Sequence, residues 1–365
     1  MMSSDSQQRG WPVWDELGAA LSEAGEIVAG IDDLDEVEIA EGYRYVTRML
    51  RQALEGAVEG SSASAPLLRL GRPETIKGPG FDNPDQIAGG AAIEAGSDYI
   101  VRGTRGTVTY LSLGTYYGRD YGQSGRSGRG GALSGDQLEY GPDGTFEIHV
   151  SGTPKPGNWL PMDPDTHVLI VRQLMLDRFN EVPAELSIER VGGAVTPPPL
   201  SREGMERRLR AAAKSMVGSI RRFAEWSREF IQMRNEMKLM DPAQMAAVHG
   251  DPMYTYIVGG FALEPDEALV VEVRPPECIY WSLTAYNYWL ETFDHRFHNV
   301  AVNKANAVAA QDGTVRVILA ARDPGVPNWI DTAGHRRGTL MLRYANSQEK
   351  PMPSCKVVPI TDLER

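Results

Sequence analysis

The chain has few cysteines, no long apolar run and no secretory signal. Only Cys278 and Cys355 occur among 365 residues, whereas small secreted scaffolds held by disulfides contain many more. No apolar run reaches the roughly 18 residues of a membrane-spanning helix, and residues 1–9 contain no apolar signal core. We therefore expect a cytoplasmic protein without a membrane span.

Positive charge is also scarce. The chain has 37 Lys and Arg residues against 49 Asp and Glu, a net charge of −12. Nucleic acids and anionic membranes are bound through clustered basic residues, so the composition argues against both partners. A hydrophobic content of 42% in 365 residues is typical of a globular protein with two packed domains.

The common catalytic motifs are absent as well. The sequence contains no G-x-x-x-x-G-K-[ST] phosphate loop, G-x-S-x-G elbow, H-E-x-x-H or C-x-x-C. It also lacks a dinucleotide fingerprint, which argues against hydride transfer. We therefore predict no cofactor, and keep a divalent metal as an alternative.

Apolar residues recur at helical spacing in three stretches. Two lie within residues 11–55, and the third runs from Met205 to Met240. The third predicts one long helix, or two helices with a break, with an apolar face that must be covered. Its spacing also suits a homo-oligomer through residues 205–240.

Short β-branched segments separated by turns fill most of the remaining chain. This pattern is typical of antiparallel sandwiches. We predict an α+β, mainly β fold: two antiparallel β-sandwich or jelly-roll-like lobes, an N-terminal helical pair and a long central helix. The predicted parts are a helical segment at 1–60, a first lobe at 70–195, the long helix at 201–240 and a second lobe at 250–360. We find no sequence repeat between the lobes.

Residues 118–135 contain seven glycines. They predict a mobile glycine-rich loop, with a lid over a binding site as the alternative.

A turn-rich segment, residues 322–335, combines Asn328, Trp329, Asp331 and His335. A carboxylate beside an imidazole fixes its tautomer and suits general acid or base catalysis. We predict His335, Asp331 and Asn328 as catalytic residues, with Asp331 orienting His335. A structural role as turn cap and backbone ligand remains open.

An aromatic strand at residues 280–289 supplies the candidate substrate contacts. Alternation places Tyr280, Ser282, Thr284 and Tyr286 on one face and Trp281, Leu283 and Ala285 on the other. The predicted substrate-binding residues are Trp281, Tyr286, Asn287, Tyr288 and Trp329. A core role for the same face remains open.

His295 and His298, with Glu291, form the candidate metal ligands. On a helix their spacing would place all three on one face.

Four segments resemble the DUF1214 family, a β-rich group often paired with a DUF1254 partner domain. They are residues 80–85 with the strands through residue 106, residues 157–161 with 171–173, residues 281–287, and residues 323–335. The resemblance implies a jelly-roll or β-sandwich fold and implies no reaction.

The leading functional hypothesis is a cofactor-independent hydrolase, lyase or isomerase that uses His and Asp acid–base chemistry on a small, largely apolar oxygenated organic molecule. The alternatives are a non-catalytic protein that binds carbohydrate or another ligand, and a metal-dependent jelly-roll enzyme.

Overall fold

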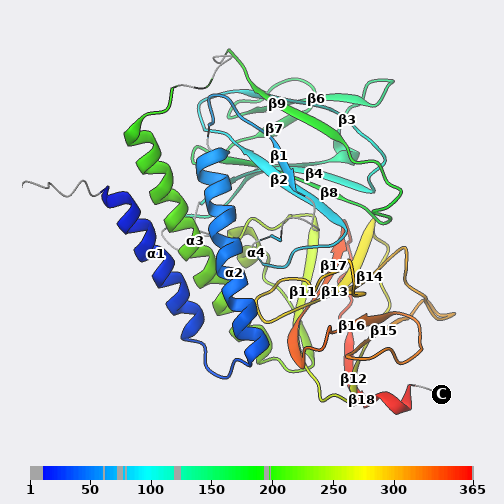
Figure 1. The fold of residues 1–365 in the computed structure, drawn as a ribbon. Coiled ribbons are helices and arrows are strands. Elements are labelled where there is room, and N and C mark those ends of the chain that lie inside the picture. The colour runs from blue at the N-terminus through cyan, green and yellow to red at the C-terminus, as the bar shows by residue number, and fades with distance from the viewer. Residues whose placement is uncertain are drawn as a thin grey trace, which may run out of the picture.

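A computed structural model describes residues 11–60, 62–71, 77–78, 80–118, 125–192, 197 and 199–363. Figure 1 shows a layer of three helices beside two β-rich lobes, with strands β1–β9 in the upper lobe and the later strands in the lower lobe. The predicted mainly β fold with two lobes, an N-terminal helical pair and a long central helix is confirmed. Within the described residues, no helix combines the length and apolarity that crossing a bilayer requires.

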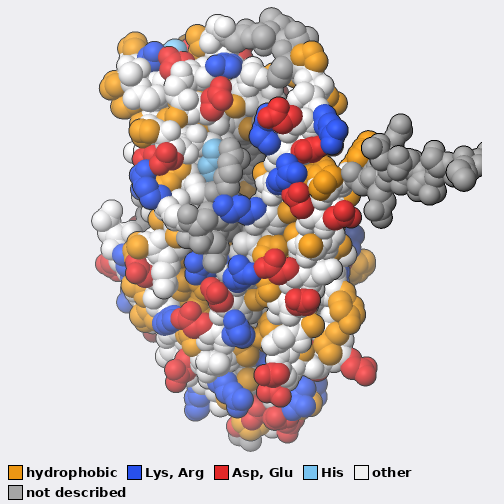
Figure 2. All heavy atoms as spheres, turned by 90° about the vertical axis from the view of Figure 1, so that its left-hand side faces the viewer, with side chains coloured by type: hydrophobic (Ala, Val, Ile, Leu, Met, Phe, Trp, Pro, Cys, Tyr) orange, Lys and Arg blue, Asp and Glu red, His pale blue; other side chains and the backbone are white. Residues whose placement is uncertain are grey.

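The helical layer contains α1 (Pro12–Ala29), α2 (Glu36–Leu54) and α3 (Arg202–Ile231). A capping box starts α2: Glu38 N donates to Asp35 Oδ1 at 2.8 Å, and Asp35 N donates to Glu38 Oε2 at 2.9 Å. A π-helical turn, Glu55–Glu59, follows α2, and the short helix α4 spans Pro242–Ala247. Figure 2 views the molecule from the side of this layer, where acidic and basic side chains are interspersed.

The apolar face of α3 is covered within the chain. It packs against α1, α2 and strands of the second lobe, and Ala212, Met216 and Ile220 are almost fully buried. Helix α3 is described throughout and presents no large exposed hydrophobic residue. The possible homo-oligomer through residues 205–240 stays a prediction.

The predicted helical run to residue 240 is wrong in its last part. Helix α3 ends at Ile231, and Asn235 adopts a left-handed φ of +64° that a helix does not accept. Glu236–Leu239 then forms β10, which pairs antiparallel with β11. The second lobe thus begins earlier than the predicted boundary at 250, with β10 as the edge strand of its first sheet.

The first lobe contains two sheets, ordered β1-β2-β8-β4-β5 and β7-β6-β3-β9. The strands are β1 (Arg69–Gly71), β2 (Gln86–Ala92), β3 (Tyr99–Thr104), β4 (Tyr110–Tyr117), β5 (Gly128–Ser134), β6 (Thr145–Ser151), β7 (Trp159–Pro161), β8 (Val168–Leu174) and β9 (Glu185–Arg190). A single 3₁₀ turn, Gly135–Gln137, follows β5.

The second lobe also contains two sheets, ordered β10-β11-β17-β13-β14 and β16-β15-β12-β18. The strands are β10 (Glu236–Leu239), β11 (Tyr254–Ala262), β12 (Glu267–Val273), β13 (Tyr280–Tyr286), β14 (Ala301–Asn303), β15 (Val315–Ala320), β16 (Trp329–Asp331), β17 (Arg337–Ala345) and β18 (Ser354–Pro359). A 3₁₀ turn, Ile360–Asp362, ends the described chain.

The two lobes repeat one topology. Strands β1–β9 correspond in order to β10–β18, and the sheet orders coincide. Each lobe even contains the same parallel pair, β6–β7 and β15–β16, within its otherwise antiparallel sheets. The motif Tyr-x-Ser-Leu-x-x-Tyr occurs on β4 (110–116) and again on β13 (280–286). The expectation of no repeat between the lobes is therefore wrong.

The glycine-rich segment 118–135 is not one loop. Gly128–Ser134 form strand β5, which pairs with β4. Residues 119–124 lie outside the described residues. The prediction of a mobile loop is wrong for residues 128–134, and the lid hypothesis for the remainder stays a prediction.

Alternation along β13 is confirmed. Trp281, Leu283 and Ala285 lie in the sandwich core of the second lobe. Tyr280 and Tyr286, on the opposite face, lie in a separate core cluster that also contains Tyr110 of the first lobe and Phe230 of α3. The hydroxyl-bearing face of this strand therefore packs where the lobes and the helical layer meet.

Two arginines at equivalent places join the lobes. Arg172 lies opposite Ser112, and Arg343 lies opposite Ser282. Arg172 Nη1 donates to Tyr116 Oη at 3.0 Å, and Arg343 Nη1 donates to Tyr286 Oη at 2.7 Å. Their Nη2 atoms donate to backbone carbonyls that precede the other lobe's first long strand, the first to His249 O and the second to Phe81 O.

Two aspartates make the reciprocal connection. Asp251, before β11, accepts hydrogen bonds from Tyr110 Oη (3.2 Å) and Ser112 Oγ (2.5 Å) of the first lobe. Asp85, before β2, accepts from Tyr280 Oη and Asn303 Nδ2 of the second lobe, each at 2.9 Å. Each lobe therefore supplies a carboxylate that accepts hydrogen bonds from hydroxyl or amide groups of the other lobe.

A glycine allows the segment before β2 to reach this position. Gly80 has a φ of +84°, and a Cβ atom there would lie 2.7 Å from the Phe223 ring of α3. Any other residue would meet both backbone strain and this ring. The close approach to α3 leads into Phe81, whose carbonyl accepts from Arg343.

We expect Asp251→Ala to lower the free energy of unfolding by about 3 kcal/mol, because it leaves buried hydroxyls and the Met253 amide without their acceptor. Urea denaturation followed by tryptophan fluorescence measures the change. Asp323→Ala, at an exposed turn, is the control and should change stability by less than about 0.5 kcal/mol. Equal effects of the two substitutions would contradict the role of Asp251 between the lobes.

Candidate functional site

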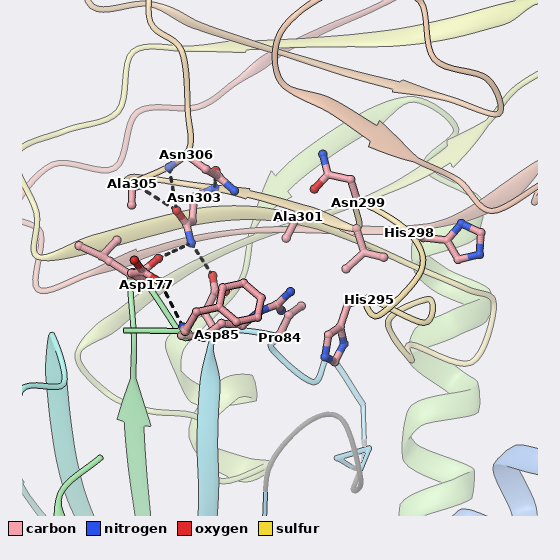
Figure 3. Close-up of a pocket in the computed structure, with 14 residues that line it drawn as sticks. Pro84, Asp85, Asp177, His295, His298, Asn299, Ala301, Asn303, Ala305 and Asn306 are labelled. Atoms are coloured by element: carbon pink, nitrogen blue, oxygen red, sulfur yellow. Dashed lines mark hydrogen bonds between the residues drawn. The ribbon is translucent and has the colours of Figure 1, made fainter. Parts of the chain in front are cut away.

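A solvent-open cleft lies between the two lobes beside Asp85. We call it cleft 1; it has a volume of about 280 Å³. The first lobe contributes Pro84, Asp85 and residues 176–179, and the second contributes His295 and residues from 298 to 306. Figure 3 shows Asp85 and Asn303 at one end, His298 at the other and His295 between them. Its walls combine polar and apolar side chains in similar measure, so the cleft suits a molecule that offers both oxygen atoms and carbon surface.

Asp85 forms the buried floor of cleft 1. Its side chain Oδ2 accepts both hydrogen bonds described above, while Oδ1 accepts none within the described residues. Burial raises the pKa of the Asp85 carboxyl above its usual value, although the hydrogen bonds from Asn303 and Tyr280 oppose the shift. A carboxyl with a raised pKa and an unengaged oxygen is suited to hold a proton and deliver it to a ligand.

His298 lines the opposite end of cleft 1 and pairs with Asp331. Its Nδ1 lies 2.7 Å from Asp331 Oδ2, and its side chain is 36% exposed. Nε2 has no hydrogen-bond partner in the described chain. A carboxylate on Nδ1 fixes the tautomer that leaves Nε2 free to accept a proton. Asp331 Oδ1 also accepts from Ala333 N at 2.7 Å, which holds the carboxylate in place.

His335, the predicted catalytic residue, lies elsewhere, and its predicted pairing with Asp331 is wrong. His335 Nδ1 bonds Thr332 O at 3.0 Å, and Nε2 lies 3.2 Å from Glu41 Oε2 of helix α2. The ring packs on Phe293 with centroids 4.5 Å apart. Burial lowers the pKa of His335, but the hydrogen bond and charge of Glu41 outweigh it, so the pKa is raised. His335 therefore joins the helical layer to the second lobe.

Asn328 has a structural role that the first lobe repeats. Its amide bonds the backbone of Val308 in both directions and donates to Arg316 O at 2.9 Å. Asn158, before β7, makes the same three bonds to residues 139 and 147. Each lobe thus uses one asparagine to hold its loop against its sheet, and Asn328 lines neither described cleft. The catalytic role predicted for Asn328 stays a prediction.

The adjacent tryptophans repeat as well. Trp329 Nε1 donates to Ala320 O at 3.0 Å, and Trp159 Nε1 donates to Ser151 O at 3.3 Å. In each lobe the indole bonds the last residue of the neighbouring parallel strand. Trp329 does not line either described cleft. The prediction of Trp329 as a ligand contact is therefore not supported.

The predicted substrate contacts on and after β13 are also part of the packing. Trp281 belongs to the core of the second lobe, and Tyr286 is fully buried against Arg343 and Phe81. Tyr288 packs among the helices. Asn287 Oδ1 accepts from Trp289 N and Glu291 N at 3.0 and 3.1 Å. None of these four residues lines cleft 1 or the second described cleft. We call the second one cleft 2; it is lined by β4, β5 and residues 251–253.

The three predicted metal ligands do not converge. His295 and His298 both line cleft 1, but they lie in turns and not on a helix. Glu291 is fully buried and bonds Arg48 Nη1 at 2.5 Å. Burial raises the pKa of Glu291 to about 7. The described residues contain no cluster of three or more His, Cys, Asp or Glu side chains able to hold a metal.

Two important residues escaped the sequence analysis. Asp85 belongs to residues 80–85, which resemble the family, but the neighbouring sequence does not indicate that its carboxylate faces the other lobe. Glu41 looked like one of many acidic residues on a helix. The repeated Tyr-x-Ser-Leu-x-x-Tyr motif was the available signal, because aligning its two copies pairs the segments around Asp85 and Asp251.

Comparison with known proteins identifies the family. A family model described as a protein of unknown function (DUF1214) matches residues 88–175 and 261–349, one match in each lobe. The chain belongs to the DUF1214 family. An uncharacterised protein from Burkholderia cenocepacia, solved by crystallography, has 39% sequence identity and a TM-score of 0.92, covering 96% of this chain and 97% of that chain. The DUF1214 resemblance drawn from the sequence is confirmed.

A more distant crystal structure shares the fold alone. A protein from Vibrio parahaemolyticus has 11% identity and a TM-score of 0.50, covering 94% of this chain and 100% of that chain. No curated protein matches the chain. The two DUF1214 matches agree with the repeated lobes and state no reaction or ligand.

The pair formed by His335 and Glu41 predicts a pH-dependent stability. Because folding raises the pKa of His335, its contribution is fully present below the ordinary histidine pKa of about 6.5 and is lost as the pH rises through the folded value. Glu41→Gln should lower the free energy of unfolding by about 1 kcal/mol near pH 6 and by less near pH 9. Urea denaturation at several pH values measures this.

The matched control is Glu16→Gln. Glu16 pairs with Arg210, which stays charged throughout this range, so its effect should not vary between pH 6 and 9. A Glu41→Gln effect that is constant over the same range would contradict the ion pair with His335.

Proposed function

We propose that this DUF1214 protein is an enzyme that transfers protons to and from a small, polar, oxygen-bearing organic molecule bound in cleft 1. One observation carries the proposal: a buried carboxyl with a raised pKa and an unengaged oxygen shares an open cleft with a carboxylate-oriented imidazole. A buried carboxyl and a more exposed imidazole that line the same cleft are characteristic of acid–base sites. The charged and amide side chains of the lining favour a more polar substrate than the largely apolar one predicted from the sequence.

The two groups suit opposite roles. His298 Nε2, with Asp331 on its Nδ1, accepts a proton from a carbon of the substrate. Asp85, protonated at the floor, donates its proton to a leaving hydroxyl at the other end. The products are an unsaturated compound and water, and solvent returns the proton from His298 to Asp85. Dehydration or isomerisation of a hydroxylated compound therefore fits better than hydrolysis.

Neighbouring side chains provide binding groups for the same molecule. Asn299 and Arg178 line the cleft and offer N–H donors to substrate oxygens. Asn303 donates to Asp85 Oδ2, and its Oδ1 accepts from Ala305 N at 2.9 Å. The amide of Asn303 therefore holds the Asp85 carboxyl in place, and it does not bond Asp85 Oδ1, which is left for the ligand. Asn303 thus positions Asp85, whereas Asn299 and Arg178 contact the ligand.

A second candidate function rests on Phe179. This side chain lines cleft 1, is 83% exposed and lies under the Arg178 guanidinium at 5.0 Å from the ring centroid. An exposed aromatic beside carboxylates and amides also suits the apolar face and hydroxyls of a sugar. Non-catalytic carbohydrate binding at the same cleft is therefore the alternative.

We expect Asp85→Asn and His298→Gln each to lower kcat/KM by at least about 100-fold, because each removes one proton carrier. Substrates are sought by ¹H NMR of hydroxy acids, keto acids and polyols with the protein in D₂O. Proton abstraction from carbon exchanges hydrogen for deuterium, and dehydration creates vinylic signals. Thermal melting should change little, since both replacements keep a hydrogen-bonding group of similar size.

The controls are His149→Gln and Asp323→Asn, which lie outside cleft 1. Both should keep full turnover. Turnover that survives in Asp85→Asn and in His298→Gln would refute the acid–base proposal.

Phe179→Ala separates the two candidate functions. If the cleft binds sugar, this substitution should weaken binding of an oligosaccharide by roughly tenfold in isothermal titration calorimetry, without altering thermal stability. Phe297→Ala is a matched control, because Phe297 is 79% exposed, contacts Arg296 in the same way and does not line the cleft. No oligosaccharide binding by the unaltered protein would exclude the alternative.

A further inference from the structure

A second cleft occupies the equivalent place in the other repeat. Cleft 2 has a volume of about 340 Å³ and is lined by β4 and β5 of the first lobe and by Asp251, Pro252 and Met253 from the segment before β11. Cleft 1 is lined in the same way by β14 and by Pro84 and Asp85 from the segment before β2. Both clefts therefore lie where one lobe's leading segment meets the edge of the other lobe's sheet.

The edge strands that line the clefts correspond over residues 132–134 and 301–303. Ser134 pairs with Ser112, as Asn303 pairs with Ser282. Gln137 Oε1 accepts from Ser134 N at 2.9 Å, and Asn306 Oδ1 accepts from Asn303 N at 2.7 Å. The same turn therefore follows the same strand in both repeats, so residues of the two clefts can be compared by position.

Cleft 1 is lined by two imidazoles, whereas cleft 2 is lined by none and contains the guanidinium of Arg129. Arg129 lies near the start of β5, where it pairs with Tyr116 of β4. The partner of His298 also has no counterpart: Asp331 pairs with Ala320 on β15, and the residue paired equivalently with Ser151 on β6 is Pro161. Cleft 2 thus contains a permanent cation, and at the place of the carboxylate of cleft 1 it has a proline.

The charge of Arg129 is not neutralised by its surroundings. Its exposed side chain makes no ion pair or hydrogen bond within the described chain. Nearby carboxylates are already engaged: Asp163 and Asp165 pair with Arg126, and Asp251 accepts from Tyr110 and Ser112. In a chain of net charge −12, an unpaired arginine in a cleft is a candidate anion site.

The backbone of β5 also differs from an ordinary edge strand at this point. Thr115 pairs with Gly131 and Tyr116 pairs with Arg129, so Gly130 is an extra, bulged residue. A Cβ atom at Gly130 would lie 2.5 Å from Asp163 N, so only glycine fits. Bulges redirect the neighbouring side chain, and here that side chain is the arginine that lines the cleft.

We propose that cleft 2 is a second ligand site, which binds a small organic anion through its carboxylate or phosphate group. Arg129 provides a two-pronged donor for the anion, and the Gln137 amide, whose nitrogen has no partner in the described chain, donates to a further oxygen. Cleft 2 has neither the imidazole nor its carboxylate, so it binds without transferring protons. The proposal is independent of the reaction proposed for cleft 1.

Isothermal titration calorimetry with inorganic phosphate and with succinate tests this site, at low ionic strength and constant chloride concentration. The unaltered protein should bind at least one probe, and Arg129→Gln should weaken that binding at least tenfold. Phosphate binding alone indicates a phosphorylated ligand, and succinate binding alone indicates a carboxylate ligand. Arg129 is exposed, so the melting temperature of Arg129→Gln should match that of the unaltered protein.

The matched control is Arg126→Gln, which removes the same charge from the same loop region but from an arginine already paired with Asp163 and Asp165. It should retain the affinity of the unaltered protein. Absence of binding for both probes, unchanged binding in Arg129→Gln, or equal losses in the two variants would overturn the proposal. Binding lost in Arg129→Gln but kept in His298→Gln would also separate cleft 2 from cleft 1.

Discussion

The rest of the structure depends on a reciprocal exchange of polar groups between the two lobes. A carboxylate of each lobe, Asp85 or Asp251, accepts hydrogen bonds from donors of the other lobe. In addition, the backbone carbonyl before the first long strand of each lobe accepts a hydrogen bond from an arginine of the other lobe. Buried donors and acceptors left without partners are costly, so loss of either carboxylate would leave donors of the other lobe unsatisfied inside the closed interface. The exchange fixes the relative position of the lobes and thereby shapes both clefts.

The duplicated fold explains which residues serve structure and which are free to diverge. Bonds that occur in both lobes, such as those of Asn158 and Asn328, maintain the sandwich. Side chains that differ between equivalent positions, such as Asp331 and Pro161, are not required for the fold. A comparison inside one chain thus distinguishes structural residues from functional candidates, where a single sequence cannot.

The same comparison accounts for the outcome of the sequence predictions. Local periodicity predicted both N-terminal helices, most of α3 and the faces of β13 correctly, because burial of one face leaves a regular pattern. Asp331 was placed in the candidate site, but its partner is His298 and not His335. The sequence correctly predicted that Asp331 pairs with a histidine. Which histidine it contacts depends on the parallel pairing of β16 with β15, which places Asp331 beside His298.

The sequence by itself determined the two-lobed, mainly β class, the DUF1214 family and the residue types available for acid–base chemistry. These properties follow from local patterns and motifs. Only the tertiary structure decided that Asp85 faces Asn303, that Glu41 meets His335 and that the lobes are repeats with two equivalent clefts. Such contacts join residues hundreds of positions apart, and burial and geometry, which no local pattern encodes, determine their chemistry.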